Sequence, residues 1–139
     1  MSGRNSQTKG YKVVTMTDLV FVYGTLKKGY SNHQLLKLAE LQSGGTTPGI
    51  MLNLGAFPAI IEGRARVFGE LYKVTPEILA SLDRLEGHPH FYERKLKEIF
   101  IDSDTVINAW CYFLSKGAQE YYQEVCEVIE TGIWDKKRL

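Results

Sequence analysis

The chain has 139 residues, the length of one domain, with 17 basic and 16 acidic side chains and a formal net charge of +1. A charge balance this close to neutral excludes the strongly basic surface by which proteins bind nucleic acids or anionic membranes. No apolar run approaches the roughly 20 residues of a transmembrane helix, and Cys111 and Cys126 lack the spacing of a zinc site or a disulfide framework. We therefore expect a cytoplasmic protein in a reducing compartment.

The first 16 residues are rich in Ser, Gly, Lys, Thr and Asn and lack the apolar segment of a signal peptide, which predicts a flexible leader. No repeat, low-complexity tract or change of composition divides the rest of the chain. Residues 17–139 are therefore predicted to form a single domain.

The apolar run Leu19–Tyr23 predicts a strand that is buried on both faces. Gly24 follows directly, and because it has no Cβ it lets the backbone turn sharply or approach a ligand closely. We interpret Tyr23, Gly24, Thr25 and Leu26 as a strand end and a loop that can present backbone N–H groups to an anion. An ordinary turn at the end of a strand fits the same residues.

The segments that follow alternate between short strands and a few helices. We predict helices at 32–38, 76–86 and 119–129, and strands at 50–54, 57–61, 67–74, 92–101 and 105–114. Asn32 and Thr75 are predicted N-caps, Gly87 is predicted to end the second helix, and 102–104 is predicted to be a turn. Short strands with two or three helices predict an α+β domain built on a curled, mixed or mostly antiparallel sheet.

The predicted helix at 76–86 directs one carboxylate inward. Glu86 falls on the apolar stripe of this helix, four residues after Leu82. Burial and the negative end of the helix dipole both disfavour the charged carboxylate, so we predict a raised pKa, which suits a general acid and base. A glutamate in a fraying last turn is usually solvated, so the helix pattern alone leaves both interpretations open. The stripe comprises Ile78, Leu79, Leu82 and Leu85.

Other groups of polar residues in the sequence give weaker indications of a functional site. Pro89 separates the imidazoles of His88 and His90 and no further ligand stands nearby, which favours a loop over a metal site. The segment 24–29 lacks the spacing of a phosphate-binding loop, and Lys27 and Lys28 are predicted to be solvated, although Lys27 could attract an acidic substrate. The chain has no Gly-x-Ser-x-Gly segment and no paired Cys/His motif.

Two separate segments resemble one family. These are Val22-Tyr23-Gly24-Thr25-Leu26-Lys27-Lys28-Gly29 with Asn32-His33, and Leu82-Asp83-Arg84-Leu85-Glu86-Gly87 followed by Phe91-Tyr92-Glu93-Arg94. Together they resemble the gamma-glutamylcyclotransferase-like proteins, most closely the small single-domain branch that includes gamma-glutamylamine cyclotransferase. The resemblance runs from Thr17 to Leu114 and includes the dipeptide Phe57-Pro58.

The resemblance implies a small, barrel-like mixed sheet with flanking helices and a cavity for a gamma-glutamyl group. It implies that the loop after the first strand binds this group through backbone amides and that Glu86 is the general acid and base. The binding residues it implies are Tyr23, Gly24, Thr25 and Leu26 in the loop and, near the pocket, Tyr92 and Tyr112.

The chemistry expected of such a site is an intramolecular reaction of a small gamma-glutamyl substrate. The α-amine attacks the side-chain amide carbonyl and releases 5-oxoproline and a free amine, with no cofactor and no metal. The loop amides could hold the substrate carboxylate or the developing oxyanion. The leaving amine, which could be a lysine side chain, a polyamine, an amino acid or an antibiotic precursor, and the oligomeric state stay open. The alternative function is a non-catalytic small-molecule binding module on the same fold.

Overall fold

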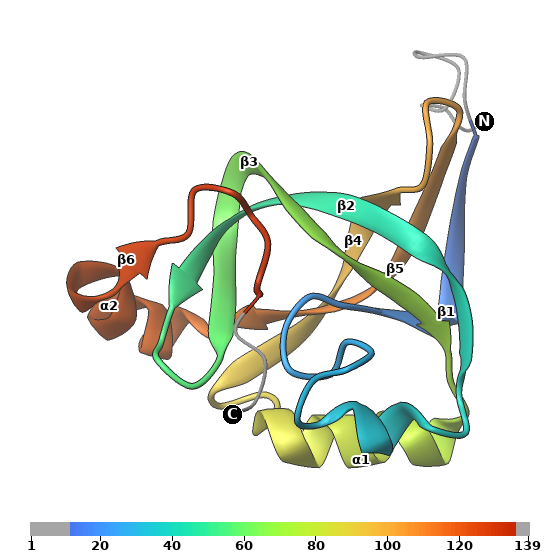
Figure 1. Cartoon of the computed structure of the whole chain (residues 1–139), viewed down its shortest axis with the longest axis horizontal. Coiled ribbons are helices and arrows are strands. Elements are labelled where there is room, and N and C mark those ends of the chain that lie inside the picture. Colours follow the sequence, from blue (N-terminus) through green and yellow to red (C-terminus); the bar gives the residue numbers. More distant parts are fainter. Residues whose placement is uncertain (1–11, 136–139) are drawn as a thin grey trace.

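Five strands close into a mixed barrel in the computed structural model, which describes residues 12–135 (Figure 1). The strands follow one another around the barrel in the order β3-β1-β5-β4-β2, and β2 pairs with β3 to close it. β1 and β5 run parallel, the other pairs run antiparallel, and the short β6 pairs with β2. The strands are β1 (Lys12–Val22), β2 (Glu40–Asn53), β3 (Pro58–Lys73), β4 (Tyr92–Phe100), β5 (Thr105–Leu114) and β6 (Glu127–Val128).

The last part of β1, Leu19–Val22, is buried on both faces, as predicted, because it separates two apolar clusters. Val20 and Val22 belong to a cluster that includes Leu82 of helix α1 (Pro76–Glu86), whereas Leu19 and Phe21 belong to a second cluster on the other face. All four β1 side chains are less than 5% exposed. Alternation along an extended strand directs neighbouring side chains to opposite faces, so this part of the strand needs an unbroken apolar run.

α1 has the bounds that its capping residues predict. Thr75 Oγ1 accepts a hydrogen bond from the N–H of Ile78, and Pro76 occupies the first turn, where its missing N–H costs nothing. Gly87 ends the helix in the left-handed region, with φ of 66°. Figure 1 shows α1 beside the 3-10 helix η2 (His33–Leu36) at one end of the barrel.

Several predicted boundaries are wrong. The helix predicted at 32–38 is only the 3-10 helix η2, because the Asn32 side chain donates to Thr25 Oγ1 instead of capping it. The helix predicted at 119–129 is α2 (Lys116–Val125), which starts early because Ser115 caps it. The residues after α2 form β6, which adds to the edge of β2.

The strands predicted at 50–54, 57–61 and 67–74 are parts of the long hairpin β2–β3, whose register shifts between Leu41 and Ser43 and between Pro48 and Ile50. β1 begins at Lys12, inside the predicted leader, because its first residues pair in register with β5. The rest of that leader, residues 1–11, lies outside the described residues. No helix in the described range 12–135 is long and apolar enough to cross a membrane.

Candidate active site

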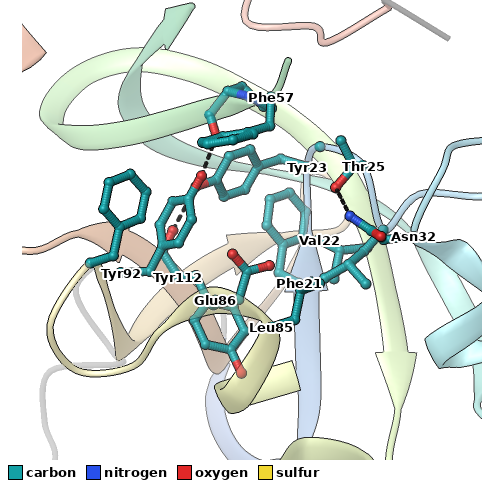
Figure 2. Close-up of a pocket in the computed structure, with 14 residues that line it drawn as sticks. Phe21, Val22, Tyr23, Thr25, Asn32, Phe57, Leu85, Glu86, Tyr92 and Tyr112 are labelled. Carbon is teal, nitrogen blue, oxygen red and sulfur yellow. Dashed lines mark hydrogen bonds between the residues drawn. The ribbon is translucent and has the colours of Figure 1, made fainter. Parts of the chain in front are cut away.

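A cavity of about 250 Å³ lies where β1 ends, beside the last turn of α1 and the first residue of β4 (Figure 2). All seven residues predicted to form the site line this one cavity, although they are up to 89 positions apart in the chain. They are Tyr23, Gly24, Thr25, Leu26, Glu86, Tyr92 and Tyr112. The same cavity is also lined by Phe21, Val22, Asn32, Phe57, Pro58, Leu85 and Phe91.

The loop after β1 folds back on itself through its carbonyl groups. Gly24 O accepts a hydrogen bond from Lys27 N at 3.1 Å, and Thr25 O accepts one from Asn32 N at 2.8 Å. Within residues 12–135, the N–H groups of Gly24, Thr25 and Leu26 donate no hydrogen bond. These N–H groups are therefore available to a ligand in the cavity that the three residues line.

Gly24 is required by packing and not by an unusual backbone angle. Its φ is not positive, whereas that of Gly29 in the same loop is 90°. A Cβ at Gly24 would lie 2.8 Å from Cγ and 2.9 Å from Cδ of Pro58, at the start of β3. The close approach at this glycine is therefore an approach to Pro58, which packs the loop directly against the start of β3.

Glu86 is the last residue of α1, and Figure 2 shows its carboxylate pointing into the cavity among aromatic side chains. Burial raises its pKa from 4.5 to about 7, and the negative charge of Asp83 adds to the effect. Burial was one of the two causes expected from the sequence, beside the helix dipole, whereas the contribution of Asp83 was not expected. At neutral pH the protonated and ionised forms of Glu86 are therefore present in comparable amounts.

Asp83, near the end of α1, forms hydrogen bonds to two strands of the barrel. Its carboxylate accepts two hydrogen bonds from Arg94 on β4, at 2.9 and 3.0 Å, and one from the Tyr112 hydroxyl on β5, at 2.6 Å. Burial alone would raise the pKa of Asp83, but the bonds from Arg94 and Tyr112 outweigh it and lower that pKa. Asp83 therefore stays ionised one helical turn before Glu86.

The three tyrosines of the cavity use their hydroxyl groups within the protein. Tyr23 donates to Tyr112 O at 2.7 Å, Tyr92 donates to Pro58 O at 2.6 Å, and Tyr112 donates to Asp83. Burial raises the pKa of all three phenols well above the ordinary range. They are therefore neutral walls of the cavity and not candidate bases.

Two side chains lie elsewhere than predicted. Leu85 was expected in the core, but it is 44% exposed and lines the cavity, one residue before the helix ends. Lys27 was expected to be solvated, but it is buried, and its Nζ donates to Trp134 O at 2.7 Å. Lys27 does not line the cavity, so it has no direct part in this site.

Asn32, Phe57 and Phe91 were not assigned to the site from the sequence, although all three line the cavity. Each stands in or beside a segment that carries the family resemblance, which is the signal that could have selected them. Among the described residues, no group of three or more His, Cys, Asp or Glu side chains could hold a metal ion. His88 instead accepts a hydrogen bond at Nδ1 from the N–H of Arg94.

Comparison with known proteins agrees with this architecture. Residues 20–136 match the family model described as "Gamma-glutamyl cyclotransferase, AIG2-like". A protein of Methanocaldococcus jannaschii, named provisionally as a gamma-glutamylcyclotransferase, is 36% identical over 120 residues, which cover 83% of this chain and 93% of that protein. The gamma-glutamylaminecyclotransferase of Rattus norvegicus is 32% identical over 93 residues, which cover 58% of this chain and 62% of that protein.

Solved structures show the same fold. The crystal structure of an AIG2-like protein from Mus musculus superposes with a TM-score of 0.69 at 24% identity, covering 87% of this chain and 96% of that one. The family model spans most of the chain, and the archaeal relative aligns over nearly its whole length. The chain therefore belongs to the gamma-glutamyl cyclotransferase family of enzymes, in its AIG2-like group.

Proposed function

We propose that this enzyme converts a gamma-glutamyl amine or peptide into 5-oxoproline and a free amine, with Glu86 as the general acid and base. One observation carries the proposal: a carboxyl group with a pKa of about 7 lies in the same cavity as a loop whose N–H groups are available. The names of the relatives support the reaction type, and the geometry of the cavity supports the assignment of roles.

The pKa of Glu86 suits the first proton transfer. The substrate's α-ammonium group has a pKa of about 8, so transfer of its proton to a carboxylate of pKa about 7 is only slightly unfavourable. Transfer to a carboxylate of ordinary pKa, 4.5, would cost roughly 5 kcal/mol. Burial of Glu86 therefore lowers the cost of forming the neutral amine nucleophile by about 3 kcal/mol.

The loop after β1 is assigned to the substrate carboxylate. Within the described residues, the lining of the cavity includes no Lys, Arg or His, and its one acidic side chain is Glu86. An anionic group must therefore be held by neutral donors, which the N–H groups of Gly24, Thr25 and Leu26 provide. This placement keeps the carboxylate on the loop and the ammonium group at Glu86.

Ring closure then needs no water and no further reagent. The α-nitrogen forms a bond to the amide carbonyl carbon and gives up its second proton, while the bond from that carbon to the amide nitrogen breaks. The departing nitrogen receives both protons, the first of them from Glu86, and leaves as an ammonium ion. Nucleophile and electrophile belong to one molecule, so the enzyme accelerates the reaction mainly by holding the ring-closing conformer. The neutral tyrosines that wall the cavity restrict the substrate to that conformer.

The test is release of 5-oxoproline from a panel of gamma-glutamyl amides by the enzyme and by Glu86→Gln. Gln keeps the shape of the side chain but cannot accept the proton, so kcat/KM is expected to fall by about 10²–10⁴-fold. Glu120→Gln, at an exposed position in α2, is the matched control and is expected to keep full activity. Full activity in Glu86→Gln would refute the assignment of the base, and binding without turnover across the panel would favour the binding module.

A further inference from the structure

Lys27 is a buried lysine that the proposed reaction does not use. It directly follows the loop residues 24–26 and is 9% exposed, although it does not line the cavity. A buried ammonium group destabilises a protein unless a polar group binds it. Here Trp134 O accepts a hydrogen bond from Lys27 Nζ at 2.7 Å and a second one from the Tyr30 hydroxyl at 3.0 Å. Lys27 therefore joins the loop to the part of the chain that contains Trp134.

The carbonyl that accepts these bonds is fixed relative to the barrel. It belongs to the segment 129–134, in which the N–H of the first residue donates to Met51 O at 2.7 Å and Gly132 O accepts from the N–H of Phe68 at 2.9 Å. Met51 lies in β2 and Phe68 lies in β3, so the segment is bonded to two strands. The Trp134 side chain is 1% exposed and packs in the apolar cluster on the second face of β1. A group bonded to this carbonyl is thus attached to a fixed point on the barrel.

The hydrogen bonds within the loop hold its shape but not its place. Lys27 N donates to Gly24 O at 3.1 Å, and the Asn32 side chain donates to Thr25 Oγ1 at 2.9 Å (Figure 2). These partners would move together if the loop shifted. Packing of Gly24 against Pro58 blocks only a shift toward β3. The Lys27 side chain supplies an attachment outside the loop.

We propose that Lys27 is a positioning residue, which sets the place of the substrate-binding N–H groups by linking their loop to the segment 129–134. The inference rests on the proposed function, in which the N–H groups of Gly24, Thr25 and Leu26 bind the substrate carboxylate. Lys27 directly follows these residues, so a displacement of Lys27 passes to their N–H groups through the backbone. Because a hydrogen bond of about 2.9 Å is lost by about 3.6 Å, a small shift of the loop is enough to weaken carboxylate binding.

A pair of substrates that differ only in the α-carboxylate tests the inference. They are the gamma-glutamyl amide of the panel that turns over fastest and its analogue with an α-carboxamide, and release of the free amine gives kcat/KM for both. Lys27→Met keeps an unbranched side chain but removes the donor to Trp134 O. The ratio of carboxylate to carboxamide turnover is expected to fall by about tenfold, which corresponds to about 1.4 kcal/mol. The fall should appear in KM more than in kcat, because the loop binds the carboxylate in the ground state and in the transition state alike.

Two neighbouring variants separate position from charge. Tyr30→Phe removes the other donor to Trp134 O without changing the charge, and it should lower the ratio by roughly threefold. Lys28→Met, the matched control, removes one charge from an exposed side chain of the same loop, keeps the backbone bond to Glu70 at 2.9 Å and should leave the ratio unchanged. An unchanged ratio in Tyr30→Phe, or an equal fall in Lys28→Met, would show that Lys27 acts through its charge and would overturn the inference. If Lys27→Met did not fold, Tyr30→Phe would carry the test by itself.

The outcomes distinguish this inference from the proposed function. A smaller amount of folded Lys27→Met would slow both substrates equally, so an unchanged ratio in this variant would overturn the inference and leave the proposed function standing. If the wild-type enzyme turned over both substrates equally well, the loop would not bind the carboxylate, and the inference would fail with that assignment. No turnover of any amide by the wild type would refute the proposed function and the inference with it.

Discussion

The buried carboxylate of Glu86 is predicted to reduce the stability of the folded enzyme above neutral pH. Folding raises the pKa of Glu86 from 4.5 to about 7, so the folded state binds this proton more tightly than the unfolded state does. The free energy of unfolding therefore falls as pH rises through the range between these two pKa values, by about 3 kcal/mol once the whole range has been crossed. Glu86→Gln removes the ionisable group and with it this loss of stability.

The size of the effect follows from the two pKa values. Between pH 5 and pH 8 the two pKa values give a difference of roughly 2–3 kcal/mol, and partial solvation of the side chain puts the expected value at about 2 kcal/mol. Urea denaturation of the wild type and of Glu86→Gln at both pH values measures it. The variant is expected to gain about 2 kcal/mol more stability at pH 8 than at pH 5, while it loses activity.

Glu120→Gln controls for the loss of one carboxylate from an exposed site in α2, and its effect is expected to stay within about 0.5 kcal/mol at both pH values. If Glu86→Gln changed stability equally at pH 5 and pH 8, its carboxylate would not be desolvated in the folded protein. The argument that burial prepares Glu86 to accept the proton of the substrate would then fail.

Three further outcomes are expected. Activity should fall below a pH of about 7, the pKa of Glu86, and Asp83→Asn should move this acid limb of kcat/KM to lower pH, because it removes the negative charge that helps to raise that pKa. An unmoved limb would exclude this coupling. Gly24→Ala should cost about 1–3 kcal/mol in urea denaturation, since the added Cβ would lie 2.8 Å from Pro58 Cγ; unchanged stability would show that the loop can shift. Tyr92→Phe should lower stability by about 1–3 kcal/mol, because Pro58 O loses its buried donor. A loss of activity as large as that of Glu86→Gln would instead give the Tyr92 hydroxyl a chemical role.

Features that depend on neighbouring residues could be predicted from the sequence. α1 begins and ends where Thr75 and Gly87 predict, because a cap is a contact between residues a few positions apart. β4 and β5 lie within one residue of their predicted bounds, since Asp102 Oδ1 accepts hydrogen bonds from two following N–H groups and closes the turn between them. The inward direction of Glu86 followed from the phase of the same helix.

Features that depend on distant partners could not be predicted. The length of β2 and β3 is set by their pairing with each other. The glycines within these segments predicted shorter and separate strands. Lys27 is buried because a carbonyl 107 positions away accepts its hydrogen bond, and no local pattern contains that information.

The sequence by itself determined the strand that leads into the loop at Tyr23–Leu26 and the helix that carries Glu86. It also determined the family resemblance. All three depend on short-range features, namely periodicity, helix caps and local motifs. Only the tertiary structure decided that these residues line one cavity and that Asp83, which is ionised, lies one helical turn from Glu86. The physical reason is closure of the barrel, which brings together side chains whose distances and desolvation depend on residues far away in the chain.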